Sequence, residues 1–222
     1  MNIDNEFFKG TIVGITQTIF GHPLDTIKTK QQNKMCIYNE TIRSLYKGFQ
    51  YQLFTYTFYN SLLFGIYSNC KKKEFTTFQS GFISGGIISV AINPFELYKI
   101  QEQVSKKSKK NVFETLHYFK MNPMRGIHYT FLRESFSTGL YFSTYYTMLN
   151  KDFNAFFSGG IAGVSSWFFT YPFDTCKTKY QINPTLSFST MLKQGGLYNG
   201  ISSCLLRAFI VNGISFYVYE LL

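Results

Sequence analysis

The chain has 222 residues, with 22 Lys and Arg against 12 Asp and Glu, and a net charge of +10. Aromatic residues make up 19% of the chain and charged residues 15%, yet the mean hydropathy is only −0.06. The charge carries no recognised nucleic-acid motif, which argues against a nucleic-acid partner. We find no P-loop, nucleophile elbow, dinucleotide fingerprint or Cys/His metal spacing, so we expect no enzyme, cofactor or metal site. The composition favours an amphipathic membrane bundle, with one face in lipid and the other lining a wet cavity.

The basic residues are unevenly distributed. Of the 22 Lys and Arg, 15 lie in three segments: 28–47, 99–125 and 177–193. Five more lie in the connections that alternate with these segments or near the N-terminus, and Arg133 and Arg207 lie inside hydrophobic stretches. This bias indicates a membrane topology signal.

Three prolines mark the same position in three repeats. Each has glycines thirteen and nine residues before it, an acid two residues after it, a lysine five after and a glutamine nine after. The prolines are Pro23, Pro94 and Pro172. Self-similarity at a fixed spacing is the signature of a repeat architecture. We therefore predict three repeats, 1–75, 76–151 and 152–222, within one domain.

Each repeat opens with a predicted helix. In the first repeat, Gly10 and Gly14 lie one turn apart, the small-residue spacing that allows close helix packing in lipid. Pro23 then removes a backbone hydrogen bond, so a kink or break is expected there and at Pro94 and Pro172. The polar residues that follow, Asp25, Lys28 and Gln32, share one helix face because of their three- and four-residue spacing.

A second predicted helix follows in each repeat, after Gly48, Gly126 and Gly200. Nineteen residues beyond each glycine is a tyrosine, and seven residues beyond are Thr55, Arg133 and Arg207. Nineteen helical residues span about 28 Å, close to the hydrocarbon thickness of a bilayer. Arginines inside a membrane need partners or a water-filled cavity, which makes these positions a functional-site hypothesis.

The tripled motif resembles the mitochondrial carrier family along essentially the whole chain. It reads PLDTIKTK with LYKG, PFELYKIQ with PMRG, and PFDTCKTK with LYNG. The resemblance implies an all-α membrane protein: six transmembrane helices in a three-fold pseudo-symmetric bundle, with short matrix-side helices. It also implies a multi-pass monomer of the mitochondrial inner membrane, with both termini on the cytosolic side. Alternating access would carry a small anionic or zwitterionic metabolite, by exchange in many members of the family.

The resemblance implies a matrix gate of ion pairs between neighbouring repeats. The pairs are Asp25 with Lys99, Glu96 with Lys177, and Asp174 with Lys28, braced by Gln32, Gln103 and Gln181. The alternative is that these charges lie at solvent-exposed helix ends, where ion pairs contribute about 0–1 kcal/mol to stability. The three-fold recurrence favours the gate.

The corresponding cytosolic gate has lost most of its charges. The three copies of its motif, at the ends of the second helices, are Tyr67-Ser68 with Lys71, Tyr145-Tyr146 with Leu149, and Tyr219-Glu220. Only Glu220 and Lys71 remain as a charge pair, so we expect a weak gate and an empty protein open to the cytosol. The candidate residues are Tyr67, Lys71, Tyr145, Tyr219 and Glu220.

The family's substrate contacts map seven and eight residues after the second-helix glycines. They are Thr55, Tyr56, Arg133, Glu134, Arg207 and Ala208. Two arginines suit an anionic group and Glu134 suits an ammonium, so amino-acid-like solutes and nucleotides are both candidates. Alternatively, Arg133 and Glu134 have a structural role only and neutralise other buried charges.

Two further expectations come from the resemblance. The glycines Gly48, Gly126 and Gly200 would mark lipid contacts, with cardiolipin the candidate lipid; their simpler explanation is helix-start or turn chemistry. The competing function is a degenerate carrier scaffold with a structural or interaction role and no transport.

Overall fold

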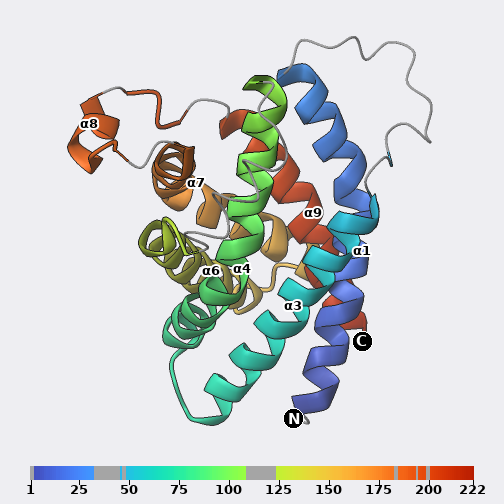
Figure 1. Ribbon diagram of the computed structural model, residues 1–222. Helices are drawn as coiled ribbons and strands as arrows, with labels where there is room; N and C mark the ends of the chain where they lie inside the picture. The colour runs from blue at the N-terminus through green and yellow to red at the C-terminus, as the bar shows by residue number, and fades with distance from the viewer. Residues whose placement is uncertain are drawn as a thin grey trace.

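The computed structural model describes residues 3–32, 46, 49–108, 124–182, 185–193, 195–198 and 201–222. Within these ranges there are seven α-helices and no strand, which confirms the all-α class for this part of the chain. The helices are α1 (Ile3–Gln32), α3 (Phe49–Lys72), α4 (Thr77–Ser108), α6 (Ile127–Leu149), α7 (Ala155–Ile182), α8 (Phe188–Lys193) and α9 (Ile201–Leu221) (Figure 1). The expected short helix near residues 38–45 lies outside the described residues.

The three first helices, α1, α4 and α7, continue past their prolines. Pro23, Pro94 and Pro172 each lie inside a continuous helix, so none of them ends its helix as a break would. A proline removes one backbone hydrogen bond. The other backbone hydrogen bonds of the helix, on both sides of the proline, are kept. The polar residues after each proline are therefore carried on the same helix as the glycines before it.

The second helices, α3, α6 and α9, each begin directly after their motif glycine. At Gly126 the backbone has φ 77°, in the left-handed region, which glycine adopts without the Cβ penalty of other residues. The conformations of Gly48 and Gly200 lie outside the described residues.

Within each repeat the two helices are in close contact at the first motif glycine. A Cβ added at that glycine would lie 2.5–2.6 Å from a backbone oxygen of the partner helix. The contacts are Gly10 with Asn60, Gly81 with Thr138, and Gly159 with Asn212. Each contacted residue is the twelfth after the glycine that precedes its helix. The small residues therefore set the same register in all three helix pairs.

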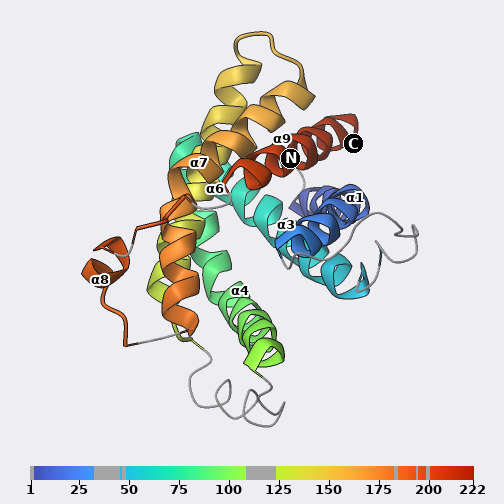
Figure 2. The same ribbon diagram turned by 90° about the horizontal axis from the view of Figure 1, so that it is seen from above.

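The helix pairs are joined in a circuit. Contacts within the repeats (α1 with α3, α4 with α6, α7 with α9) alternate with contacts between them (α3 with α4, α6 with α7, α9 with α1) (Figure 2). Both chain termini lie at one end of the bundle, which we call the terminal end, and α8 lies toward the other (Figure 1). Buried side chains of α1, α3, α4, α6, α7 and α9 form the main hydrophobic core.

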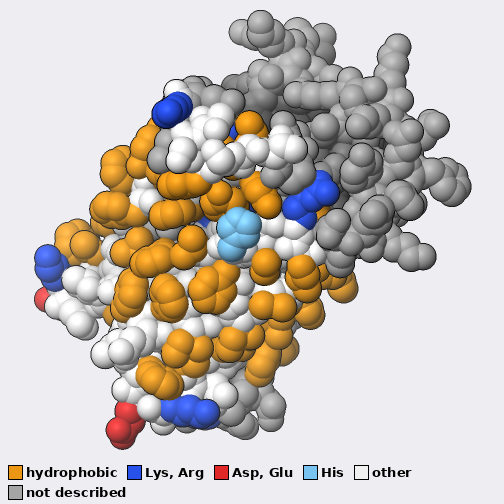
Figure 3. Space-filling model, turned by 60° about the vertical axis from the view of Figure 1, so that its left-hand side comes forward, with side chains coloured by type: hydrophobic (Ala, Val, Ile, Leu, Met, Phe, Trp, Pro, Cys, Tyr) orange, Lys and Arg blue, Asp and Glu red, His pale blue; other side chains and the backbone are white. Residues whose placement is uncertain are grey.

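Large hydrophobic side chains also cover the outside. Phe131, Phe136, Phe168 and Phe169 are all more than one-third exposed. Figure 3 shows a face whose middle is covered by hydrophobic side chains, with most of the visible charges near its margins. An apolar surface of this extent is atypical of a water-soluble monomer. By length and composition, one helix of the described part contains an apolar span suited to crossing a membrane, Cys204–Leu221.

Candidate functional site

A cluster of five charged side chains lies where α4, α6 and α7 meet, and Arg133 is at its centre. The Arg133 guanidinium contacts the neighbouring Glu134, lies 3.1 Å from Glu96 Oε1, and has its Nε 3.4 Å from Asp174 Oδ1. Glu96 also pairs with Lys177. We call these five residues the central charge cluster.

Most of the central charge cluster is buried. Arg133, Glu134 and Lys177 are 7%, 3% and 2% exposed. A charge removed from water is costly unless it is paired, and here each buried charge has an opposite partner. Three carboxylates and two basic groups leave the cluster with a formal charge of −1.

Two aromatic side chains complete this arrangement. The Tyr59 hydroxyl of α3 donates a hydrogen bond of 3.0 Å to Glu134 Oε2, while the other carboxylate oxygen of Glu134 contacts Arg133. The Arg133 guanidinium lies 5.8 Å from the ring centre of Trp167 on α7, within the range of a cation–π interaction. Residues of all three repeats therefore meet at the Arg133–Glu134 pair.

The second predicted arginine contacts another repeat. Arg207 of α9 donates a 2.7 Å hydrogen bond to the Tyr56 hydroxyl of α3, joining the third repeat to the first. Ala208 is buried, with 1% exposure, and Thr55 is exposed. The structure thus places Arg133 among carboxylates and links Arg207 to the first repeat through Tyr56.

The described part of the predicted matrix gate contains one of its three pairs. Glu96 and Lys177 are in contact. Gln181 donates to Asn93 Oδ1 at 3.3 Å and to the Arg125 carbonyl at 3.4 Å, so it bonds to α4 and to the backbone just before α6. The side chains of the remaining gate residues lie outside the described residues: Asp25, Lys28, Gln32, Lys99 and Gln103.

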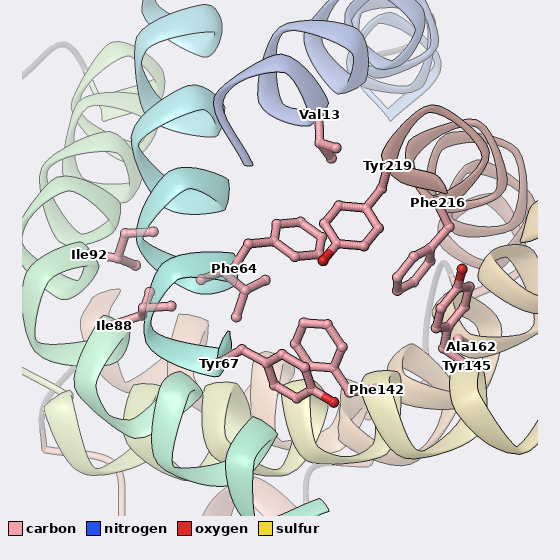
Figure 4. Packing of buried hydrophobic residues seen from close by; sticks show 11 residues of the cluster. Val13, Phe64, Tyr67, Ile88, Ile92, Phe142, Tyr145, Ala162, Phe216 and Tyr219 are labelled. Atoms are coloured by element: carbon pink, nitrogen blue, oxygen red, sulfur yellow. The ribbon is translucent and has the colours of Figure 1, made fainter. Parts of the chain in front are cut away.

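The residues predicted for the cytosolic gate lie at the terminal end. Tyr67, Tyr145 and Tyr219 are all buried in the main core (Figure 4). The Tyr145 hydroxyl donates to Glu220 Oε1 at 2.7 Å, and that of Tyr219 donates to Glu6 Oε2 at 2.7 Å. Each carboxylate therefore accepts from a tyrosine.

The remaining predicted charge pair does not form in this structure. Lys71 Nζ lies 3.3 Å from the Phe75 carbonyl, and the ion pairs of the described residues do not include Lys71 with Glu220. The charge count predicts a weak closure and an open end; the structure instead has this end packed with buried aromatic rings. A count of charge pairs does not include the packing of apolar residues, which here fill the space between the helix ends.

Several residues of these sites were missed by reasoning from sequence. Phe64, Phe142 and Phe216 lie sixteen residues after the second-helix glycines, so the repeat spacing held a signal for them. Tyr59 and Glu6 have no such three-fold counterpart: their roles appear only once α3 faces α6 and α1 faces α9.

Two smaller findings concern ligands. Among the described residues, no group of three or more His, Cys, Asp or Glu side chains is placed to hold a metal ion. Gly126, a predicted lipid contact, is buried at the start of α6; a Cβ there would lie 3.1 Å from Gln181 Cγ.

The comparison with known proteins places this chain in a family. A model of the family described as "Mitochondrial carrier protein" matches residues 2–76 and 150–222. The chain therefore belongs to the mitochondrial carrier family, whose members are integral proteins of the mitochondrial inner membrane that transport solutes.

Similar curated proteins cover nearly the whole chain. A mitochondrial arginine transporter of Arabidopsis thaliana is 28% identical over 97% of this chain and 89% of its own length. A mitochondrial basic amino acids transporter of Rattus norvegicus is 27% identical over 94% of this chain and 78% of its own. Mitochondrial substrate carrier family protein S of Dictyostelium discoideum is 30% identical over 96% and 94%. The first two of these names concern amino acids.

Proposed function

We propose that this protein carries a basic amino acid, such as arginine or ornithine, across the mitochondrial inner membrane by alternating access. The observation that carries the proposal is the buried Arg133–Glu134 pair at the centre of the bundle. Its residues occupy the family's contact positions and are met there by groups from all three repeats.

The charges of the central cluster suit this cargo. A basic amino acid has one carboxylate and two cationic groups, with a net charge of +1. Arg133 and Arg207 would bind the carboxylate through their guanidinium groups, and Glu134 would bind an ammonium. The formal charge of −1 on the central cluster attracts a cation. The names of the arginine, basic amino acid and ornithine transporters among the similar proteins support the same cargo.

The architecture proposed for the membrane is six spanning helices in a pseudo-symmetric ring of three repeats. The supporting observations are the circuit of helix contacts, the matching glycine contacts in the three repeats and the apolar side chains on the outside. The terminal end would face the cytosol and the basic connections the matrix. We also propose a monomer that contacts lipid, with cardiolipin the candidate, at Gly48, Gly126 and Gly200.

Transport would follow from competition for the buried charges. A substrate carboxylate that binds Arg133 competes with Glu96 and Asp174 for the same guanidinium. Since Glu96 also holds Lys177, binding at the centre changes the partners of a matrix-gate pair. A ligand shifts a conformational equilibrium only by binding one state better than another, and this shared arginine provides such a difference.

The test is uptake by purified protein in liposomes. We expect uptake of labelled arginine, ornithine and lysine, and none of glutamate or ADP, with and without amino acid loaded inside to detect exchange. Uptake of ADP alone would overturn the basic amino acid assignment. Absence of all uptake by folded protein, shown by a cooperative thermal unfolding transition, would favour the structural role.

The site assignment is tested by the arginines. We expect Arg133→Ala and Arg207→Ala each to reduce uptake at least about tenfold, because each removes a charge-assisted bond worth about 1.5–3 kcal/mol. Uptake that persists when both are replaced would refute the site, whereas the carrier function would stand. Lys151→Ala, at an exposed position, is the matched control and should be unchanged.

A further inference from the structure

Six aromatic rings lie at the terminal end in a repeating arrangement. Each second helix supplies a phenylalanine and, three residues later, a tyrosine, so that both lie on one helix face. The pairs are Phe64 and Tyr67 on α3, Phe142 and Tyr145 on α6, and Phe216 and Tyr219 on α9. All six side chains belong to the buried core. We call them the aromatic ring set.

Each tyrosine of the set stacks on the phenylalanine of the next repeat. Tyr67 lies 3.8 Å from Phe142 between ring centres, with 15° between the planes. Tyr145 lies 3.4 Å from Phe216 at 7°, and Tyr219 lies 4.6 Å from Phe64 at 17°. The order runs from α3 to α6, from α6 to α9 and back to α3, so the stacks close a cycle (Figure 4).

The three phenylalanines also contact one another. Their ring centres are 5.8, 6.4 and 6.3 Å apart, with planes at 84°, 88° and 81°. Edge-to-face packing at these distances is a favoured geometry of aromatic rings. Inside the cycle of stacks the space between the three helices is therefore filled with apolar rings.

We infer that Phe64, Phe142 and Phe216, with their stacked tyrosines, are functional residues of the transport cycle that close the terminal end. The inference rests on the proposed carrier function. It means that the predicted cytosolic gate is closed by aromatic packing and not by a ring of ion pairs. The neighbouring carboxylates, Glu6 and Glu220, accept hydrogen bonds from two tyrosines of the set. The nearby lysines contact other groups: Lys9 Nζ lies 5.1 Å from the ring centre of Tyr219, and Lys71 donates to the backbone carbonyl of Phe75.

Two consequences distinguish this closure from one made of ion pairs. Because the six rings form one cycle, loss of any one phenylalanine removes a stack and its edge contacts with the other two phenylalanines; Phe216 also has an edge contact with Tyr219. All three positions should therefore contribute to the closure. Because apolar contacts are not screened by salt while exposed charge pairs are, the closure should resist high ionic strength.

The chain provides its own reporter of opening. Trp167 is the only tryptophan and lies beside Arg133 in the centre of the bundle. Iodide, an aqueous quencher, is added only outside liposomes in which the terminal end faces outward, an orientation verified by protease removal of a terminal tag. Quenching of Trp167 then measures access through the terminal end and requires no substrate.

The variants are Phe64→Leu, Phe142→Leu and Phe216→Leu, which keep an apolar side chain and remove the ring. Each is expected to raise the open-to-closed ratio about threefold to tenfold, and hence the quenching. Phe54→Leu is the matched control, since Phe54 is on α3 but 67% exposed; it should behave as the unmodified protein. Quenching by all three variants that equals the control, or that rises in one alone, would overturn the inference.

A second measurement uses the unmodified protein and so does not depend on variants that fold. Raising the salt from about 0.1 M to about 1 M shortens the Debye length from about 10 Å to about 3 Å. With iodide held constant, quenching should stay the same; a marked rise would show a closure held by charge pairs. If the protein transports no amino acid, the proposed function fails while these experiments still decide how the end is closed.

Discussion

Arg133 connects charges that the sequence presents as separate sets. It lies at a predicted substrate position, and its guanidinium reaches Glu96 and Asp174, which were predicted as gate residues. The family resemblance predicts both sets from sequence. Their sharing of one guanidinium depends on how α4, α6 and α7 pack, which residue spacing within a helix does not reveal.

Tyr59 offers a test at the level of one hydroxyl group. Tyr59→Phe removes the donor to Glu134 Oε2 and leaves the ring. A hydrogen bond to a charged group contributes about 1.5–3 kcal/mol, so we expect the KM for arginine uptake to rise at least about tenfold with little change in kcat. Initial rates over a range of arginine concentrations measure both.

The control for this variant is Tyr217→Phe, because Tyr217 is 53% exposed on α9. It should leave KM unchanged. If Tyr59→Phe also leaves KM unchanged while thermal unfolding shifts, the hydroxyl has only a structural role.

The pair of Glu96 and Lys177 tests the energetics of buried charge. Glu96→Gln leaves Lys177, 2% exposed, without the Glu96 carboxylate, and it is the burial of the lysine, not of the 29% exposed Glu96 side chain, that makes the loss of this partner costly. We expect a clear fall in the midpoint of thermal unfolding in detergent. Adding Lys177→Met should recover much of it, since both charges are then gone. Equal midpoints for the single and double variants would contradict this account.

Asp174→Asn is the comparison variant at this scale. The Asp174 side chain is 33% exposed, and partly solvated ion pairs contribute about 0–1 kcal/mol. Its midpoint should stay close to that of the unmodified protein.

At the scale of the helices, the glycine spacing was sufficient to predict which faces pack. Gly14 of α1 lies against α3: a Cβ there would be 2.6 Å from the Tyr56 carbonyl oxygen. Helix continuity past the prolines was less predictable. A proline destabilises the helix locally, and whether the helix continues depends on the contacts along its entire length. Sequence reasoning left a kink and a break open, and the structure excludes the break.

This packing predicts a contrast within α1. Gly14→Ala should destabilise the protein by about 1–3 kcal/mol, because the added methyl group meets backbone atoms. In Gly21→Ala the nearest atom is 3.5 Å away, an ordinary contact with Val211. That substitution should be neutral or stabilise by up to about 1 kcal/mol through helix propensity. Thermal unfolding of both variants checks the prediction; equal destabilisation would argue against close packing at Gly14.

For the whole molecule, the position of the two termini predicts what each side of the membrane exposes. Both termini lie at one end and α8 lies toward the other (Figure 1). In mitochondria with a ruptured outer membrane, tags at both termini should be cleaved by added protease. An epitope inserted at residues 185–187, before α8, should be protected until detergent is added. Cleavage of one terminal tag alone would rule out an even number of spans.

The sequence by itself determined the three-fold motif, and it predicted the helices that carry the motif. It could do so because each of these is a property of spacing along one chain: the glycine faces, the polar face after each proline and, in two of the three repeats, an arginine seven residues after the second-helix glycine. The repeated motif carries the resemblance to the mitochondrial carrier family, and the match of the family model shows that the chain belongs to it. The six aromatic positions were also present in the spacing, although their role was not evident.

Only the tertiary structure decided which groups meet. The partner of Glu134 is Tyr59, seventy-five residues earlier, and the partner of Tyr219 is Glu6 at the other end of the chain. Residues at equivalent positions also reach across to other repeats: Arg133 contacts Asp174 of the third repeat, and Arg207 donates to the Tyr56 hydroxyl of the first. The physical reason is that ion pairs, stacks and closures depend on distances between helices, which packing of the whole ring sets and local sequence does not encode.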